Sequence, residues 1–253
     1  MLDEVSRIAS EAGRIAQARC GGDYERWEKV PGHPVCAVDL EVDAFLRREL
    51  TQLDPEAGWL SEETLDLSDR IERSRLWVVD PIDGTRDYLR GRSGWAVSVA
   101  LVEERTPILG VLDAPARGEH WKAGKGQGAW RNNEPIRVSG RHVFAGARVP
   151  ADQLPEVDGD LVAVERPNSI ALRIAMVAAG EADLAVTLRW GFEWDIAAAA
   201  LIASEAGARV TGVLGQPLAF NSAAGSAFGV LVATPDIHAA AIERLRERAM
   251  DAV

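Results

Sequence analysis

The sequence predicts a layered α/β protein whose first half is rich in antiparallel strands and whose second half alternates strands with helices. Three observations support this class. Apolar residues at helical spacing fill residues 2–18, short apolar runs separated by turn residues follow between 76 and 122, and strand and helix patterns alternate after about residue 140. The change in pattern predicts a domain boundary between 135 and 145, with domains at 1–140 and 141–253.

In the first half, apolar periodicity predicts two helices separated by a Gly/Pro-rich break at residues 21–34. The second helix begins near Val38 or Asp39 and continues to Leu53. A buried strand at 76–79 ends at Asp80, and an Asn132-Asn133 turn closes the strand-rich region. The other strands are expected at residues 95–102, 108–112 and 119–122.

In the second half, the pattern predicts a smaller mixed sheet covered by helices. Strands are expected at 183–188 and 228–233. Helices are expected at 169–179, 194–206 and 235–250, the last of which has a proline at its start.

Composition excludes several classes of function. The net charge of -11 argues against a nucleic-acid polymer or an anionic membrane as partner. No apolar run approaches the roughly 18 residues of a membrane span, and the N-terminus lacks a signal-peptide pattern. Cys20 and Cys36 form neither a metal-binding spacing nor a disulfide framework. We therefore expect a cytoplasmic enzyme that acts on a small-molecule substrate.

The motif Asp80-Pro81-Ile82-Asp83-Gly84-Thr85 carries the strongest chemical signal. It places two carboxylates three positions apart around a backbone carbonyl, and such oxygen ligands suit a hard cation such as Mg²⁺. The Gly-Thr pair follows at a predicted helix start, where backbone N–H groups can bind a phosphate. The motif predicts a metal-dependent phosphatase acting on a small phosphorylated substrate.

Further acidic residues occur where a fold could bring them to this motif. They are Asp39 at a helix start, the pair Glu62-Glu63 after a strand, and Asp195 at the start of an Ala-rich helix. Each alone has an ordinary structural explanation, as a solvated surface pair or a helix cap. The prediction of a site depends on their combination with the Asp80–Thr85 motif.

This ordered set resembles the inositol monophosphatase superfamily of lithium-sensitive, Mg²⁺-dependent phosphatases. The family's Trp-Asp is matched by Trp194-Asp195, and the later Gly-Gly is replaced by Gly207-Ala208. The resemblance covers nearly the whole chain. It implies a sugar-phosphatase-like αβαβα fold, two or three Mg²⁺ ions in each active site, inhibition by Li⁺ and, as is common in the family, a homodimer. It also implies that residues 1–140 carry most of the metal ligands.

The resemblance also implies the ligand set. Glu62, Asp80 and the carbonyl of Ile82 would hold one Mg²⁺ ion. Asp80, Asp83 and Asp195 would hold a second ion, and Glu62 would reach a third.

The remaining implied roles concern proton transfer and phosphate binding. Thr85, hydrogen-bonded to Asp39, would help to deprotonate the attacking water, while the N–H groups of Gly84 and Thr85 would bind a phosphate oxygen. Glu63 is given a supporting role, and Trp194 is expected to pack rather than to act in catalysis.

Within the superfamily, the sequence is more similar to the 3′(2′),5′-bisphosphate nucleotidase branch. Asp83–Tyr88, Leu60–Glu63 and Arg189-Trp190-Gly191 resemble that branch. Arg189 suits a second phosphate better than a neutral polyol, and Arg173 stands where nucleotidases often have Lys. Both are predicted substrate-binding residues, together with Gly84, Thr85 and Asp195.

Some positions depart from the family, mostly on the substrate side. Cys36 replaces a threonine, Asn168-Ser169-Ile170 replaces a Gly/Ser/Thr-rich segment, and residues 142–165 form a short connection.

Three hypotheses for the function follow. The first is hydrolysis of adenosine 3′,5′-bisphosphate to AMP and phosphate, in salvage of the nucleotide by-product of sulfate assimilation. The alternative is a monoester phosphatase for inositol phosphate, histidinol phosphate or a related alcohol phosphate. The third is a binding protein that has lost catalysis, although none of the expected carboxylates is missing.

Overall fold

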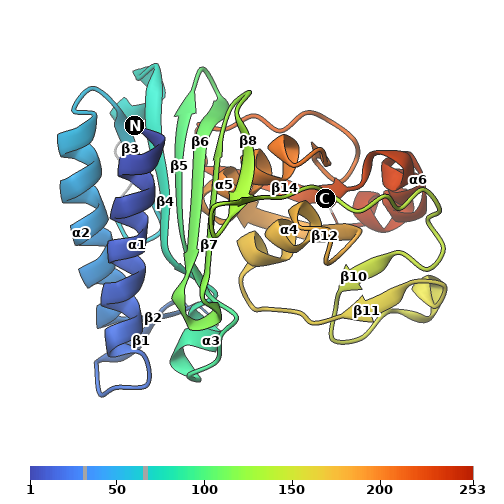
Figure 1. Ribbon diagram of the computed structural model, residues 1–253, viewed down its shortest axis with the longest axis horizontal. Coiled ribbons are helices and arrows are strands. Elements are labelled where there is room, and N and C mark those ends of the chain that lie inside the picture. Colours follow the sequence, from blue (N-terminus) through green and yellow to red (C-terminus); the bar gives the residue numbers. More distant parts are fainter. Residues whose placement is uncertain (31–32, 65–67, 253) are drawn as a thin grey trace.

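Five layers of helix and sheet follow one another along the long axis of the protein (Figure 1). The computed structural model describes residues 1–30, 33–64 and 68–252. Helices α1 (Leu2–Arg19) and α2 (Ala37–Leu53) cover a seven-stranded sheet. Helices α4 (Ile170–Ala178) and α5 (Glu193–Glu205) separate it from a three-stranded sheet, on which α6 (Pro235–Met250) packs. The layered α/β prediction is confirmed.

The two predicted N-terminal helices form, and each buries one apolar stripe. Val5, Ile8 and Ala12 are buried on α1, and Val42 and Leu46 are buried on α2, as helical periodicity requires. The break between the helices contains a hairpin that the sequence did not indicate: β1 (Arg26–Val30) pairs antiparallel with β2 (His33–Cys36). Residues 31–32 of the break lie outside the described residues.

The large sheet has the strand order β3-β4-β5-β6-β7-β8-β9. Its strands are β3 (Gly58–Ser61), β4 (Arg75–Asp83), β5 (Ala96–Glu103), β6 (Thr106–Ala114), β7 (Glu119–Gly124), β8 (Gly128–Arg131) and β9 (Glu134–Pro135). All neighbours are antiparallel except β3 and β4, which run parallel at one edge. The predicted Asn132-Asn133 turn joins β8 to β9 with φ of 51° and 66°. One parallel pair therefore modifies the expected antiparallel sheet.

The second half contains two small sheets. β12 (Leu184–Phe192), β14 (Ser226–Ala233) and β13 (Arg209–Thr211) form the antiparallel three-stranded sheet, and β10 (Arg148–Pro150) pairs parallel with β11 (Val162–Val164). The prediction of one small mixed sheet is therefore wrong in detail, because one of the two sheets is antiparallel and the other is parallel. Short helices complete the chain: α3 (Thr85–Leu89), η1 (Ser68–Glu72), η2 (Pro115–Arg117) and η3 (Glu156–Asp158).

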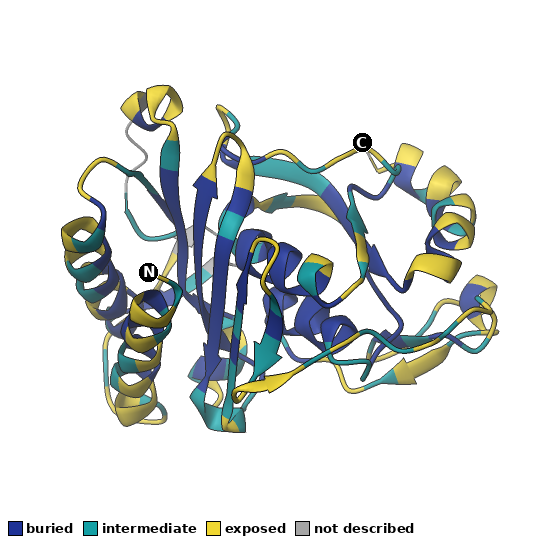
Figure 2. Cartoon of the chain, turned by 45° about the horizontal axis from the view of Figure 1, so that its top comes forward, coloured by how far each residue is buried: buried dark blue, intermediate teal, exposed yellow. Residues whose placement is uncertain are grey.

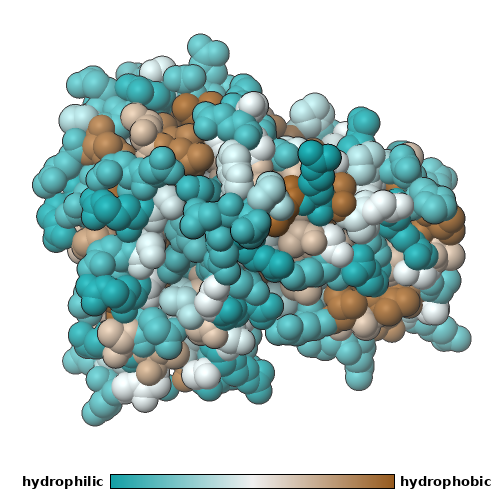
Figure 3. Space-filling model, in the orientation of Figure 1, coloured by the Kyte–Doolittle hydropathy of each residue, from teal (hydrophilic) through white to brown (hydrophobic). Residues whose placement is uncertain are grey.

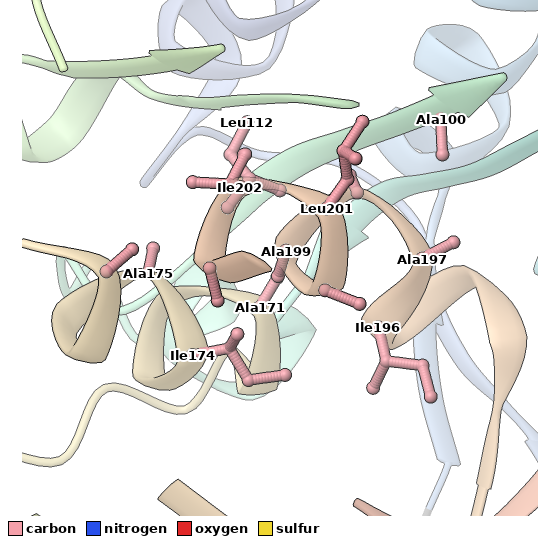
Figure 4. Packing of buried hydrophobic residues seen from close by; sticks show 14 of the residues in the cluster. Ala100, Leu112, Ala171, Ile174, Ala175, Ile196, Ala197, Ala199, Leu201 and Ile202 are labelled. Atoms are coloured by element: carbon pink, nitrogen blue, oxygen red, sulfur yellow. The ribbon is translucent and has the colours of Figure 1, made fainter. Parts of the chain in front are cut away.

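Helices α4 and α5 form the centre of the core, although they belong to the second half of the chain. Both are buried over most of their length (Figure 2), and apolar residues such as Ile174, Ile202 and Leu112 meet between them and the large sheet (Figure 4). A helix that is apolar all round is suited to such a central layer. Gly110 of β6 permits the close approach, because a Cβ there would lie 2.6 Å from the Ala198 carbonyl oxygen.

The outer surface is mostly hydrophilic on the face shown in Figure 3, where apolar residues form only small groups. Among the described residues, no helix is both long and apolar enough to cross a membrane.

Candidate active site

A bulge in β4 puts Asp80 and Asp83 on one face of the strand. Residues three apart on a regular strand point to opposite faces. Here Asp80 pairs with Ser98 and Asp83 with Ala96, so β4 holds one more residue than β5 between the two pairs. Pro81 lies at the bulge, consistent with its lack of an N–H for the ladder. The strand therefore continues through the motif instead of ending at Asp80 as predicted.

The two aspartates meet a third from the other half of the chain. Asp195, in the first turn of α5, joins Asp80 and Asp83, and one carboxylate oxygen from each lies within 4.8 Å of the others. The cluster faces a cavity of about 450 Å³. Oxygen atoms at this separation fit a hard divalent cation, which is the chemistry predicted for these residues.

The electrostatics of the cluster also favour a bound cation. Burial raises the pKa of Asp80 well above its ordinary value, and the negative charges of Glu62, Asp83 and Asp195 raise it further. Burial likewise raises the pKa of Asp195, followed by the charges of Asp83 and Glu62. Crowded, buried carboxylates of this kind are stabilised in their charged form by a cation. The donor set therefore fits the expected Mg²⁺.

Asp83 has a second role, because it links the two halves of the protein. Its Oδ2 accepts hydrogen bonds from the Ser169 hydroxyl at 2.5 Å and from the Ala171 N–H at 2.8 Å, at the start of α4. Burial raises its pKa to about 6, while these bonds and the charge of Arg173 act in the opposite direction. The substrate-side helix is thus attached directly to a predicted metal ligand.

The Glu62-Glu63 pair is divided between two environments. Glu62 follows β3, lines the cavity and raises the pKa of both Asp80 and Asp195 by its charge. It lies outside the group of three carboxylates that meet within 4.8 Å. Glu63 is partly buried, and its backbone N–H donates to the Ser61 hydroxyl at 3.4 Å. Of the pair, only Glu62 belongs to the cavity.

The expected hydrogen bond between Thr85 and Asp39 is not made. The Thr85 hydroxyl donates instead to the Ile82 carbonyl at 3.1 Å, so the predicted backbone ligand has a protein partner. Asp39 is 1% exposed, and its Oδ2 accepts from the Cys36 N–H at 2.8 Å and the Cys36 thiol at 2.9 Å. Cys36 is thus the N-cap residue of α2, at the position where the family has a threonine. Gly84 and Thr85 line the cavity, whereas Asp39 is not one of its lining residues.

Arginines line the same cavity as the carboxylates. The predicted residues Arg173 and Arg189 both line it, and so do Arg86 and Arg166, which were not predicted as site residues. Arg173 is buried, donates to the carbonyls of Pro167 and Asn168, and has its pKa lowered to about 10 by burial. Arg189 is exposed. The cavity therefore combines a cation-binding cluster with groups that attract anions.

Two aromatic residues at the end of β12 also line the cavity. Trp190 is 60% exposed and Phe192 is 41% exposed, and Phe192 stacks on Trp194 with ring centroids 4.4 Å apart. Trp194 also borders the cavity, in addition to packing against Phe192. In the sequence, the only sign of this surface is that aromatic residues follow the predicted strand at 183–188. That their rings are exposed depends on how β12 meets α5.

Carboxylates for a hard cation, together with arginines for an anion, define a metal-dependent phosphatase. The comparison with protein families makes the assignment specific. Residues 1–251 match the model of the inositol monophosphatase family, and the chain belongs to that family. The resemblance seen in the sequence is confirmed.

Relatives within the family are named for different activities. The chain is 31% identical over 240 residues to a 3′(2′),5′-bisphosphate nucleotidase CysQ from Aggregatibacter actinomycetemcomitans, covering 87% of each chain. It is 32% identical over 234 residues to an inositol-1-monophosphatase from Mesorhizobium japonicum, covering 83% of this chain and 85% of the relative. Among solved structures, an IMPase from Thermotoga maritima superposes with a TM-score of 0.84 at 28% identity, covering 99% and 98% of the two chains.

Proposed function

We propose that this phosphatase is a 3′(2′),5′-bisphosphate nucleotidase that converts adenosine 3′,5′-bisphosphate to AMP and phosphate. One observation carries the proposal: a single cavity is lined by three clustered carboxylates and by four arginines, Arg86, Arg166, Arg173 and Arg189. The first group suits the phosphate that is cleaved, with its metals. The second suits a phosphate that is retained. The relative named as a bisphosphate nucleotidase supports the same assignment.

The residues of the cavity would divide the reaction among them. Two or three Mg²⁺ ions held by Glu62, Asp80, Asp83 and Asp195 would neutralise phosphoryl charge and acidify a water. Glu62 and Thr85 line the cavity and are suited to orient the attacking water. The N–H groups of Gly84 and Thr85 are suited to bind a phosphate oxygen. In-line attack on phosphorus would then release the alcohol of the ribose.

Arg189 and Trp190 would select the nucleotide. A guanidinium group presents planar paired donors to phosphate, and Arg189 is exposed at the cavity, where it can reach one. Trp190 presents an exposed ring on which a base could stack. A neutral polyol such as inositol would use neither group.

The alternative is hydrolysis of inositol phosphate, histidinol phosphate or a similar monoester. It is favoured by the relative named as an inositol-1-monophosphatase, at 32% identity. The test is steady-state hydrolysis of adenosine 3′,5′-bisphosphate, inositol 1-phosphate and histidinol phosphate with Mg²⁺. The proposal requires the highest kcat/KM for the bisphosphate, and a higher value for either monoester would replace it.

A variant of Arg189 tests whether this residue binds the phosphate that is retained rather than the one that is cleaved. Arg189→Ala removes a charged hydrogen-bonding group, so the KM for the bisphosphate should rise about 10–100-fold while monoester hydrolysis changes little. Arg246→Ala, at an exposed position of α6, is the matched control and should behave as wild type. Equal losses on both substrates would contradict the assignment of Arg189.

The homodimer and the cytoplasmic location stay predictions.

A further inference from the structure

A turn at residues 221–225 lies between the segments that carry Glu62 and Asp195. On one side the Gly225 carbonyl accepts the N–H of Glu193, the first residue of α5, at 2.9 Å. On the other side the turn packs on β3, because a Cβ added to Gly225 would lie 3.4 Å from the Leu60 side chain. Leu60 lies two positions before Glu62. The turn therefore touches both segments without lining the cavity.

A buried carboxylate fixes the turn to α5. Glu193 is fully buried and accepts hydrogen bonds from the Asn221 N–H at 2.6 Å, the Ser222 N–H at 2.9 Å and the Ser222 hydroxyl at 2.5 Å. Burying a carboxylate is costly unless such bonds replace its lost hydration. These three bonds and the bond from the Glu193 N–H to the Gly225 carbonyl hold the start of α5 in one position relative to the turn.

A buried guanidinium fixes the same turn to the first half of the chain. Arg70 of η1 is 2% exposed; its Nη1 donates to Asn221 Oδ1 at 2.6 Å and its Nη2 to the Ser222 carbonyl at 3.0 Å. In return, the Asn221 Nδ2 donates to the Arg70 carbonyl at 3.2 Å. η1 packs beside β3, since a Cβ at Gly58 would lie 3.1 Å from Arg70 Cβ. Asn221 thus joins a charged group from each half.

We propose that Glu193, Asn221 and Arg70 are positioning residues that hold Asp195 and the Glu62 segment in register for metal binding. The inference rests on the metal-binding role of these carboxylates in the proposed function. Asp195 lies two residues after Glu193, so a shift at the start of α5 displaces its carboxylate directly. Groups that orient metal ligands typically affect metal affinity about 10–100-fold when they are removed.

Two substitutions break the network in different ways. Glu193→Gln keeps the size of the side chain but turns an NH₂ group towards backbone N–H donors. Asn221→Gly removes both bonds to Arg70 while keeping the left-handed backbone, φ 58°, which glycine tolerates. The matched control is Asp183→Asn. Asp183 is also buried and accepts several bonds, from Arg148 and Ser139, but it precedes β12 at the end remote from the cavity.

The experiment measures Mn²⁺ binding to the full chain by calorimetry without substrate, together with Tm. We expect Glu193→Gln and Asn221→Gly to weaken the tightest Mn²⁺ site about tenfold or more. Asp183→Asn should lower Tm but leave the Kd within about twofold, as a purely structural role would. Wild-type Kd in both network variants, despite a lower Tm, overturns the inference. Should Glu193→Gln not fold, Asn221→Gly alone decides. Absence of Mn²⁺ binding by the wild type would instead overturn the metal site of the proposed function.

Discussion

A methyl group added at Gly84 should destabilise the protein in two ways, by straining the backbone and by clashing with neighbouring atoms. Its φ is +97°, a conformation that favours glycine. A Cβ there would lie 2.6 Å from the Gly94 carbonyl oxygen, 2.9 Å from the Ser169 nitrogen and 3.1 Å from the Trp95 Cα. The first two atoms are themselves hydrogen-bonded at 2.8 Å. The methyl group of Gly84→Ala would therefore enter between backbone segments that are already bonded together.

The magnitude follows from two costs. The left-handed conformation costs an alanine about 1–2 kcal/mol, and overpacking against fixed neighbours costs about 1–3 kcal/mol more. The free energy of unfolding should fall by about 2–5 kcal/mol, which lowers Tm by about 4–20 °C in a chain of this size. Because Gly84 separates Asp83 from Thr85, a displacement of about 1 Å should also reduce kcat/KM on the order of 100-fold.

The control is Gly91→Ala, which isolates the strain. Gly91 has φ +64°, and nothing lies within 4 Å of an added Cβ. In urea unfolding, Gly91→Ala should lose less free energy of unfolding than Gly84→Ala, and the difference should equal the overpacking cost of about 1–3 kcal/mol. Gly91→Ala should keep its activity. If both variants unfold at the same urea concentration and hydrolyse phosphate esters equally well, the steric reasoning is wrong.

Three further predictions concern charge. Asp83→Asn should abolish Mg²⁺-dependent turnover in a phosphate-release assay, because it removes a clustered charge while keeping an oxygen for Ser169; near wild-type activity would contradict the ligand assignment. Li⁺ should inhibit by occupying a weak Mg²⁺ position with less charge, and a flat titration to tens of millimolar would count against this. Burial alone would raise the pKa of Asp183, but bonds from Arg148 and Ser139 lower it below its ordinary value. Its stabilisation is therefore present above the unfolded pKa of about 3.9 and is lost as pH falls through the folded pKa. The difference in unfolding free energy between wild type and Asp183→Asn should shrink on acidification, and a constant difference would contradict the shift.

The elements of the fold were predictable where the signal is local. Helices α1 and α2 follow from the spacing of apolar residues, because one face of each is buried. Strand β5 follows from its run of apolar residues, and both of its faces are buried. The hairpin at residues 26–36 gave no such signal, since it is short and interrupted by a Gly/Pro-rich segment, and Arg26, Trp27 and Glu28 of its first strand are all exposed. The parallel pairing of β3 with β4 also escaped prediction, because strand direction depends on the path of the chain between them.

The site divides in the same way. Residue type and motif made Asp80, Asp83 and Asp195 candidate ligands, and the structure brings their carboxylates together. The hydrogen bond from Thr85 to Ile82 and the approach of Arg166 to the cavity were not predictable. Each depends on atoms that meet only after the backbone has folded.

By itself, the sequence determined the family, the layered α/β class and the carboxylates that would bind metal, because these depend on residue type and on order along the chain. Only the tertiary structure decided how they act together. The bulge at Pro81 turns two aspartates to one face, and α5 brings Asp195 from the other half of the chain. The turn at 221–225 is bonded both to α5 and to η1 of the first half. The physical reason is that direction and distance between groups far apart in the chain are set by packing, which no local pattern encodes.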